Sequence, residues 1–397
     1  MERLQQALRM ALIDAGIKKP GPTVISKCLG LDKSIAWKIG RLAKAEHPLQ
    51  ALQYLPGQQG SRIVVAAFVA AGSPDKVQAE LEAAFAALEL DIEHHAGDRN
   101  TAKAMARAAL PTEDLPTLDE NLRRDQFRTS CAIWGAQARV QIKADFLAPG
   151  SEPGSIDTAG FEGFVDLQRL RQGVSWRVAR KRIFNTKGGA LKSPFEALDL
   201  EHRGKGSLPL FQKYCTHPLP RLSANEDQEG FLNFELEPGR VGRTGSVTCL
   251  IATCCKGLIR LPSPGEVDKV LAGAHLRTPS ELLVLDFFVH RSLTTLAEPT
   301  AGLFGQMKMG PSFPLSGKDQ PLPVPFSIEL LSTRPGTQAL LEAPKHAEAV
   351  QDAVTMAAKV FGEEYWQLED FVGYRVRLTY PPLPSFGGIN VELGHPG

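Results

Sequence analysis

Six side chains between residues 33 and 44 have the chemistry needed to contact nucleic acid. They comprise four cations, one hydroxyl and one indole: Lys33, Ser34, Trp37, Lys38, Arg41 and Lys44. Ammonium and guanidinium groups bind phosphates, and Arg, Lys and Ser also reach base edges in the DNA major groove. The segment contains no Asp or Glu that would repel a duplex. We therefore predict that these six residues bind DNA.

The same segment has the spacing of an amphipathic helix. On a helical wheel with about 100° per residue, the six side chains cover one arc. The other arc holds the apolar residues Ile35, Ala36, Ile39, Leu42 and Ala43. We therefore expect residues 33–45 to form a helix that packs through one face and presents the other face to a partner.

The residues before this helix predict a tight turn. Residues 23–30 are expected to form a preceding helix, and Gly30 suits a left-handed position at its end because glycine has no Cβ. Leu31 can fill the corner between the two helices. Asp32 is of a residue type preferred at the N-cap, so the second helix is expected to begin there.

The segment TVISKCLGLDKSIAWKIGRLAK, residues 23–44, resembles the helix-turn-helix of bacterial DNA-binding regulators. The resemblance rests on Leu-Gly-Leu, two further residues, Ser and an apolar-periodic helix, and covers about 60 residues with the flanking helices. It implies that residues 32–44 form the recognition helix. Ser26 stands where such motifs usually have Ala, and Ala36 stands where they usually have Val or Ile. The alternative interpretation is a plain helix pair in a bundle.

A second basic segment, RLRQGVSWRVARKR at residues 169–182, surrounds Trp176 with cations. Such interleaving can hold a nucleic-acid backbone and stack a base. The candidate residues of this second basic patch are Arg177, Arg180, Lys181 and Arg182. We favour the alternative of an edge strand whose charges prevent aggregation, because the two-faced pattern of residues 33–44 is absent.

Signatures of common enzyme classes are absent from the sequence. There is no Gly-x4-Gly-Lys-Ser/Thr, Gly-x-Gly-x-x-Gly, Gly-x-Ser-x-Gly or His-Glu-x-x-His motif. The fragment GRVGRTG at residues 239–245 is similar to the arginine motif of superfamily 2 helicases, but its partner motifs are missing, so we interpret it as a turn. We assign no catalytic residue, no metal ligand and no cofactor. Enzymatic activity stays open, with a non-enzyme favoured.

Two further sets of polar residues fall in apolar segments. Four cysteines lack the paired spacing of zinc ligands and are interpreted as buried thiols: Cys215, Cys249, Cys254 and Cys255. Asp286 and His290 lie on one face of an expected strand, about 13 Å apart. Each therefore needs a partner from elsewhere, either as a satisfied core residue or as part of a pocket.

The wider pattern predicts where these residues are positioned. A chain of 397 residues with 43% hydrophobic residues can form two or three domains. Helical periodicity dominates up to residue 137, with a Pro-containing linker at 111–120. Residues 148–160 are expected to form a loop, and a late helix is expected at 345–361. Strand patterns follow the loop, at 174–184, 230–236, 246–254, 282–291, 325–331, 373–380 and 389–393.

We therefore predict an α+β fold, with an all-α N-terminal region that carries the helix-turn-helix and a β-rich mixed α/β body. The expected domains are a helix-turn-helix module (1–58), a helical region (59–140) and a mixed domain (141–397) for effector binding or oligomerisation.

The charge distribution supports a polyanionic partner. The formal net charge is +1, yet residues 1–60 carry nine Lys and Arg against four Asp and Glu, and residues 121–215 carry sixteen against nine. Local positive potential attracts phosphates whatever the total charge. The longest apolar run, residues 63–72, is too short to span a membrane. Without a secretory signal or a cysteine framework, a reduced cytoplasmic protein is expected.

Together these features predict a cytoplasmic, sequence-specific DNA-binding protein that regulates transcription. We expect a homodimer held by the body, since such modules commonly bind paired half-sites. The body would sense a small-molecule effector or mediate oligomerisation, and no membrane partner is expected. The alternatives are an enzyme or assembly protein with a helix-turn-helix-like scaffold, or a mobile-element protein that binds DNA for another purpose.

Overall fold

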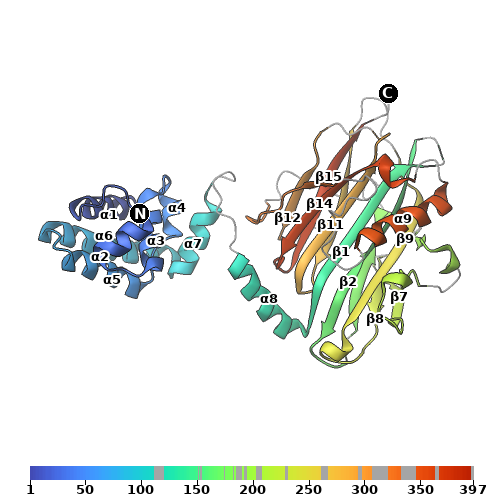
Figure 1. Cartoon of the computed structure of the whole chain (residues 1–397), viewed down its shortest axis with the longest axis horizontal. Helices are drawn as coiled ribbons and strands as arrows, with labels where there is room; N and C mark the ends of the chain where they lie inside the picture. Colours follow the sequence, from blue (N-terminus) through green and yellow to red (C-terminus); the bar gives the residue numbers. More distant parts are fainter. Residues whose placement is uncertain are drawn as a thin grey trace. The chain divides into compact units, whose positions relative to one another are not determined.

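The computed structural model forms two compact units, Met1–Thr117 (unit 1) and Leu118–Gly397 (unit 2) (Figure 1). Helices come first and a sheet-rich body follows, so the predicted α+β class is confirmed. The structure describes residues 1–110, 120–150, 152, 154–173, 175–181, 183–184, 190–191, 195–202, 208–228, 231–260, 267–293, 297–305, 321–331, 346–362 and 366–394.

The described part of unit 1 is built from helices. They are α1 (Glu2–Asp14), α2 (Pro22–Leu29), α3 (Lys33–Lys44), α4 (Pro48–Leu52), α5 (Gln58–Ala70), α6 (Asp75–Ala96) and α7 (Arg99–Ala108). All of these helices lie in the region up to residue 137 that the sequence pattern predicts to be helical. Local capping explains several ends: Asp98, for example, accepts hydrogen bonds from the backbone of Asn100 and Thr101 at the start of α7.

One hydrophobic core joins the helices of unit 1. Leu4 and Leu8 of α1 belong to the same buried cluster as Leu81 and Phe85 of α6, and α1 packs directly against α6. Residues 1–58 therefore share their core with later helices. The division of the chain lies at Thr117 rather than at the expected residues 58 and 140.

This shared core predicts how fragments of unit 1 behave. A fragment of residues 1–110 should melt cooperatively, whereas residues 1–60 should not, because the shorter piece loses α6, which packs on α1, and most of α5, which packs on α2. Circular dichroism during thermal unfolding measures both. A cooperative transition in the 1–60 fragment would contradict the single core.

Unit 2 begins with α8 (Glu120–Trp134) and is otherwise dominated by strands. The longer strands are β1 (Ala136–Pro149), β2 (Ser155–Arg169), β9 (Val247–Arg260), β10 (Val267–Leu276), β11 (Ser280–His290), β14 (Phe371–Thr379) and β15 (Ser385–Gly394). The shorter ones are β3 (Trp176–Lys181), β4 (Ile183–Phe184), β5 (Ala190–Leu191), β6 (Glu196–Ala197), β7 (Leu222–Glu226), β8 (Leu232–Leu236), β12 (Thr300–Phe304) and β13 (Glu329–Leu331). Helix α9 (His346–Phe361) confirms the expected late helix.

A seven-stranded sheet organises unit 2, in the order β13-β14-β11-β1-β2-β9-β6. Its strands are antiparallel except for the central β1–β11 pair, which is parallel. Helix α9 packs on one face, in a cluster with β1 side chains such as Ile142 and Phe146 (Figure 1). Two small sheets, β10-β15-β12 and β3-β8-β7, pack on the other face.

The largest difference from the sequence-based expectation is the hairpin of β1 and β2. Residues 148–160 were expected to form a loop, but β1 extends to Pro149 and β2 starts at Ser155. The expected helix over 119–137 likewise ends at Trp134. Close packing of β1 and β2 requires glycine at position 160, because a Cβ there would collide with the carbonyl oxygen of Ala144 on β1. The sequence pattern also did not predict strands β5, β6, β7, β10 and β12.

A buried ion pair joins the centre of the large sheet to α9. Asp286 on β11 and Arg375 on β14 are directly paired residues, with Arg375 Nε 2.6 Å from Asp286 Oδ1. His346, the first residue of α9, places Nε2 2.9 Å from Asp286 Oδ2. All three residues are at most 2% exposed. Burial by itself would raise the pKa of Asp286, but hydrogen bonds from Arg375 and His346 hold this pKa below its ordinary value.

Removing this carboxylate should destabilise unit 2. We expect Asp286→Ala to cost about 3–5 kcal/mol of unfolding free energy, because it leaves the Arg375 charge buried without its carboxylate. The matched control is Glu329→Ala, which breaks the half-exposed pair with Arg377 and should cost less than about 1 kcal/mol. Urea titration followed by tryptophan fluorescence measures both, since three of the four tryptophans lie in unit 2. An equal loss of unfolding free energy in the two variants would contradict the stabilising role of Asp286.

The same pair predicts a pH dependence. The folded-state pKa of Asp286 is lowered, so its contribution is fully present above the unfolded pKa of about 3.9 and is lost as pH falls through the folded value. The stability gap between the parent protein and Asp286→Ala should therefore narrow in acid. Urea midpoints measured from pH 7 down to the lowest pH at which unit 2 stays folded test this, and a gap that widens would contradict it.

Candidate nucleic-acid interface

The turn between α2 and α3 has the expected local structure. Gly30 has φ 63° and ψ 20°, a left-handed conformation that glycine adopts without strain. Leu31 is buried between the helices. Asp32 caps α3, with its Oδ1 accepting a hydrogen bond from the backbone of Ser34 at 2.7 Å. Ser26, the departure from the usual Ala, donates to the carbonyl of Leu31 at 2.7 Å and so closes the corner.

Helix α3 has one packed face and one open face. Ala36, Ile39 and Leu42 are fully buried against the other helices of unit 1. Five of the six predicted DNA-binding residues are exposed, and Lys38 is half-buried: Lys33, Ser34, Trp37, Lys38, Arg41 and Lys44. The structure therefore brings these residues together on one helix surface, which is the arrangement that the wheel predicts.

Two side chains of α1 hold the end of α3. Gln5 Nε2 donates to the carbonyls of Leu42 and Ala45, at 3.1 and 3.0 Å. Arg9 Nε donates to the carbonyl of Ala43 at 2.7 Å. These carbonyls belong to the last turn of α3 and to its C-cap residue Ala45, where a helix leaves carbonyls without an internal partner, so α1 satisfies them and fixes the orientation of α3. Sequence periodicity gives no signal for this contact.

Lys103 of α7 adds a cation near Lys38 of α3. Burial lowers the pKa of Lys103, and the nearby charge of Lys38 lowers it further. Lys103 Nζ lies 3.4 Å from the carbonyl oxygen of Leu55, which places the ammonium beside the chain that follows α4. Sequence reasoning missed Lys103 because it lies 65 residues from Lys38 and is not part of the motif.

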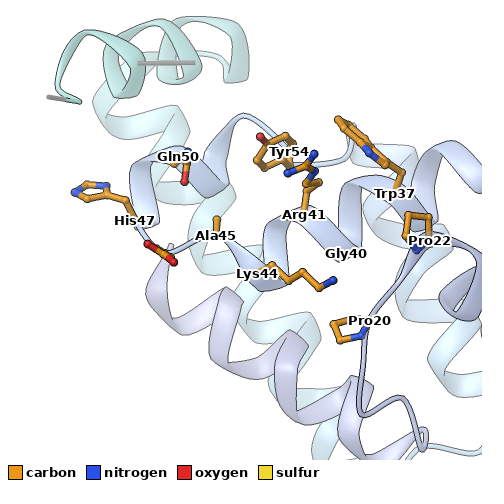
Figure 2. Close-up of a pocket in the computed structure, with 11 residues that line it drawn as sticks. Pro20, Pro22, Trp37, Gly40, Arg41, Lys44, Ala45, His47, Gln50 and Tyr54 are labelled. Atoms are coloured by element: carbon orange, nitrogen blue, oxygen red, sulfur yellow. The ribbon is translucent and has the colours of Figure 1, made fainter. Parts of the chain in front are cut away.

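A cleft of about 690 Å³ lies beside the open face of α3 (Figure 2). Its lining includes Gly40, Arg41 and Lys44 of α3, Pro20 before α2, and Tyr54 after α4. Trp37 is at one end, with its ring centroid 5.6 Å from that of Tyr54 and the two planes at 86°. The Arg41 guanidinium is 5.7 Å from the centre of the indole. We call this space the α3–α4 cleft.

The second basic segment has a different environment. The three described cations of β3 are matched with acids: Arg177 with Glu235, Arg180 with Asp227, and Lys181 with Glu162. Arg180 also stacks over the ring of Phe231 at 3.6 Å. Strand β3 is the edge of its small sheet, as in the alternative favoured from the sequence. Arg182 lies outside the described residues.

Lys181 belongs to an ion network that the sequence did not reveal. Lys181 Nζ lies 2.8 Å from Glu162 on β2, and Lys143 Nζ lies 3.3 Å from Asp145 on β1. Burial by itself would raise the pKa of Glu162, but the positive charges of Lys181 and Lys143 hold this pKa below its ordinary value. Burial and neighbouring cations lower the pKa of His275 to about 4. Each ammonium here has a carboxylate partner, so the network balances its own charge.

The other polar residues singled out from the sequence, Asp286, His290 and the four cysteines, are buried in unit 2. Asp286 is part of the buried ion pair with Arg375, while His290 Nδ1 lies 2.7 Å from the hydroxyl of Ser292. The four cysteines interpreted as buried thiols are buried and free, which confirms that interpretation. In the residues that the structure describes, no group of three or more His, Cys, Asp or Glu is arranged to hold a metal ion.

Comparisons with protein-family models, with curated proteins and with solved structures find no match to this chain. Among the described residues, no helix combines the length and apolar character that crossing a membrane requires.

The two faces of α3 should respond differently to an added charge. Ile39→Asp should destabilise unit 1 by at least about 3 kcal/mol, because it places a carboxylate without a partner in the core. Lys33→Asp places the same side chain on the exposed first turn, and its effect should stay within about 0.5 kcal/mol. Thermal unfolding by circular dichroism compares the two. An Ile39→Asp protein as stable as the parent would contradict the assigned packed face.

Proposed function

We propose that this protein binds duplex DNA in a sequence-dependent manner through the open face of α3. The observation that carries the proposal is the separation of the two faces of this helix. Ile39 and Leu42 are buried, while the opposite side presents four cations, a hydroxyl and an indole without a carboxylate on the helix. A helix with this surface can enter the major groove, where cations meet phosphates and base edges.

The position along α3 suggests separate roles for its side chains. Lys33 and Ser34 lie in the first turn, next to the N-cap Asp32, where recognition helices usually meet base edges. Lys38, Arg41 and Lys44 lie further along and are placed to contact phosphates. Lys103 of α7 adds a cation near Lys38 and would extend the phosphate contacts.

The proposal includes a biological role, the regulation of transcription. A sequence-dependent DNA-binding unit joined to a separate body fits a transcriptional regulator, with the body acting in oligomerisation or effector sensing. A cytoplasmic homodimer would place two α3 helices on paired half-sites about one helical turn apart. The mobile-element alternative uses the same surface and differs only in which genomic sites are bound.

The proposal is tested by binding isotherms of the full chain. They are measured on a selected duplex and on a random duplex over a range of salt concentrations. The triple variant Lys33→Ala, Lys38→Ala, Arg41→Ala should lose affinity for both duplexes, and the slope of log K against log[salt] should fall by about one per lost phosphate contact. Ser34→Ala should cost about 1–3 kcal/mol on the selected duplex and less on random DNA.

The matched control is Arg62→Ala with Lys76→Ala, which removes two exposed cations on α5 and α6. This variant should bind both duplexes as the parent does. A folded triple variant that retains parental affinity on both duplexes would show that α3 is only a scaffold, and would favour the enzyme or assembly alternative.

A further inference from the structure

The α3–α4 cleft differs from the rest of the open face of α3 because it is concave. Gly40, Arg41 and Lys44 of α3 line it. Pro20 forms part of one wall and Tyr54 part of the other (Figure 2). The volume of about 690 Å³ is within the range of about 300–1,000 Å³ that is typical of small-molecule sites.

The aromatic end of the cleft can stack a planar group. Trp37 is 43% exposed, so a large part of its indole is accessible to a ligand. The nearly perpendicular Tyr54 ring and the Arg41 guanidinium support the indole and restrict its rotation. The exposed part of the indole is therefore held in place, and bases stack on aromatic rings of this kind.

Besides its aromatic end, the cleft has two cationic side chains, Arg41 and Lys44. Figure 2 shows the Lys44 side chain extending toward Pro20, while the Arg41 side chain projects toward Tyr54. Glu46 also lines the cleft, so two full positive charges face one carboxylate. The excess of positive charge favours an anion, and a guanidinium with an ammonium is a common pair of phosphate ligands.

We propose that the α3–α4 cleft binds a single nucleotide, with its base against Trp37 and its phosphate bound by the cations of the cleft, Arg41 and Lys44. The inference rests on the proposed function, because both assign nucleic-acid chemistry to α3. The nucleotide can be free in solution, or it can be an unpaired nucleotide at the end of a bound strand. Both sources present the same base and phosphate to the cleft.

The experiment uses the full chain and follows tryptophan fluorescence, which stacking of a base on the indole quenches. Deoxyadenosine monophosphate is the free probe, and deoxyadenosine is the same probe without phosphate. A duplex with a one-nucleotide overhang is compared with a blunt duplex of the same sequence. The monophosphate should quench saturably, and deoxyadenosine should bind about tenfold more weakly because it lacks the charge-assisted contacts.

Variants assign the signal to the cleft. Trp37→Phe should abolish the quenching, because the reporter is then absent. Arg41→Ala and Lys44→Ala should each weaken binding of the monophosphate about tenfold, and Tyr54→Leu should weaken it through the loss of support for the indole. Arg62→Ala, an exposed cation outside the cleft, should bind the monophosphate as the parent does.

The outcomes separate this inference from the proposed function. Blunt-duplex binding without quenching by the monophosphate or the overhang overturns the inference and leaves the proposed function standing. Quenching by the monophosphate without duplex binding overturns the proposed function and supports a free nucleotide as ligand. Quenching only by the overhang duplex supports the strand as the source. Equal quenching in the parent and in Arg41→Ala and Lys44→Ala overturns the assignment of the phosphate.

Discussion

Burial of the apolar face of α3 is the constraint on which unit 1 depends. Ala36, Ile39 and Leu42 can be covered only if the other helices approach from that side, so the opposite side must remain open. The contacts from Gln5 and Arg9 then fix the end of the helix by satisfying its terminal carbonyls. The cationic surface is thus held by the packing of its other face, and its side chains are positioned by a rigid element.

In unit 2, a buried ion pair joins the large sheet to α9. Its parallel β1–β11 pair lies in the centre of the large sheet, covered by α9 on one face and by two small sheets on the other. Asp286 links β11, β14 and the start of α9 through Arg375 and His346. A buried ion pair is costly to desolvate, so it specifies one arrangement of these three elements more than it adds stability.

The two basic segments show why charge counts alone do not identify a binding surface. Both contain several cations and one tryptophan, yet Arg177, Arg180 and Lys181 of β3 are paired with acids from other parts of unit 2. The cations of α3 face solvent instead. A strand has side chains of neighbouring strands beside it, whereas the outer side of a surface helix has fewer neighbours. The difference in secondary structure therefore decides which cations can contact a phosphate.

The sequence by itself determined the elements whose pattern is local. Periodicity, Gly30 and Asp32 were sufficient for the α2–turn–α3 segment, because a helix, a left-handed turn and an N-cap depend on neighbouring residues. Apolar periodicity likewise indicated α9. Tertiary structure decided the rest: the hairpin of β1 and β2, the acid partner of each cation on β3, the three elements that meet at Asp286, and the walls of the cleft beside Trp37. These features join residues far apart in the chain, and their pairing depends on register and packing that no local pattern specifies.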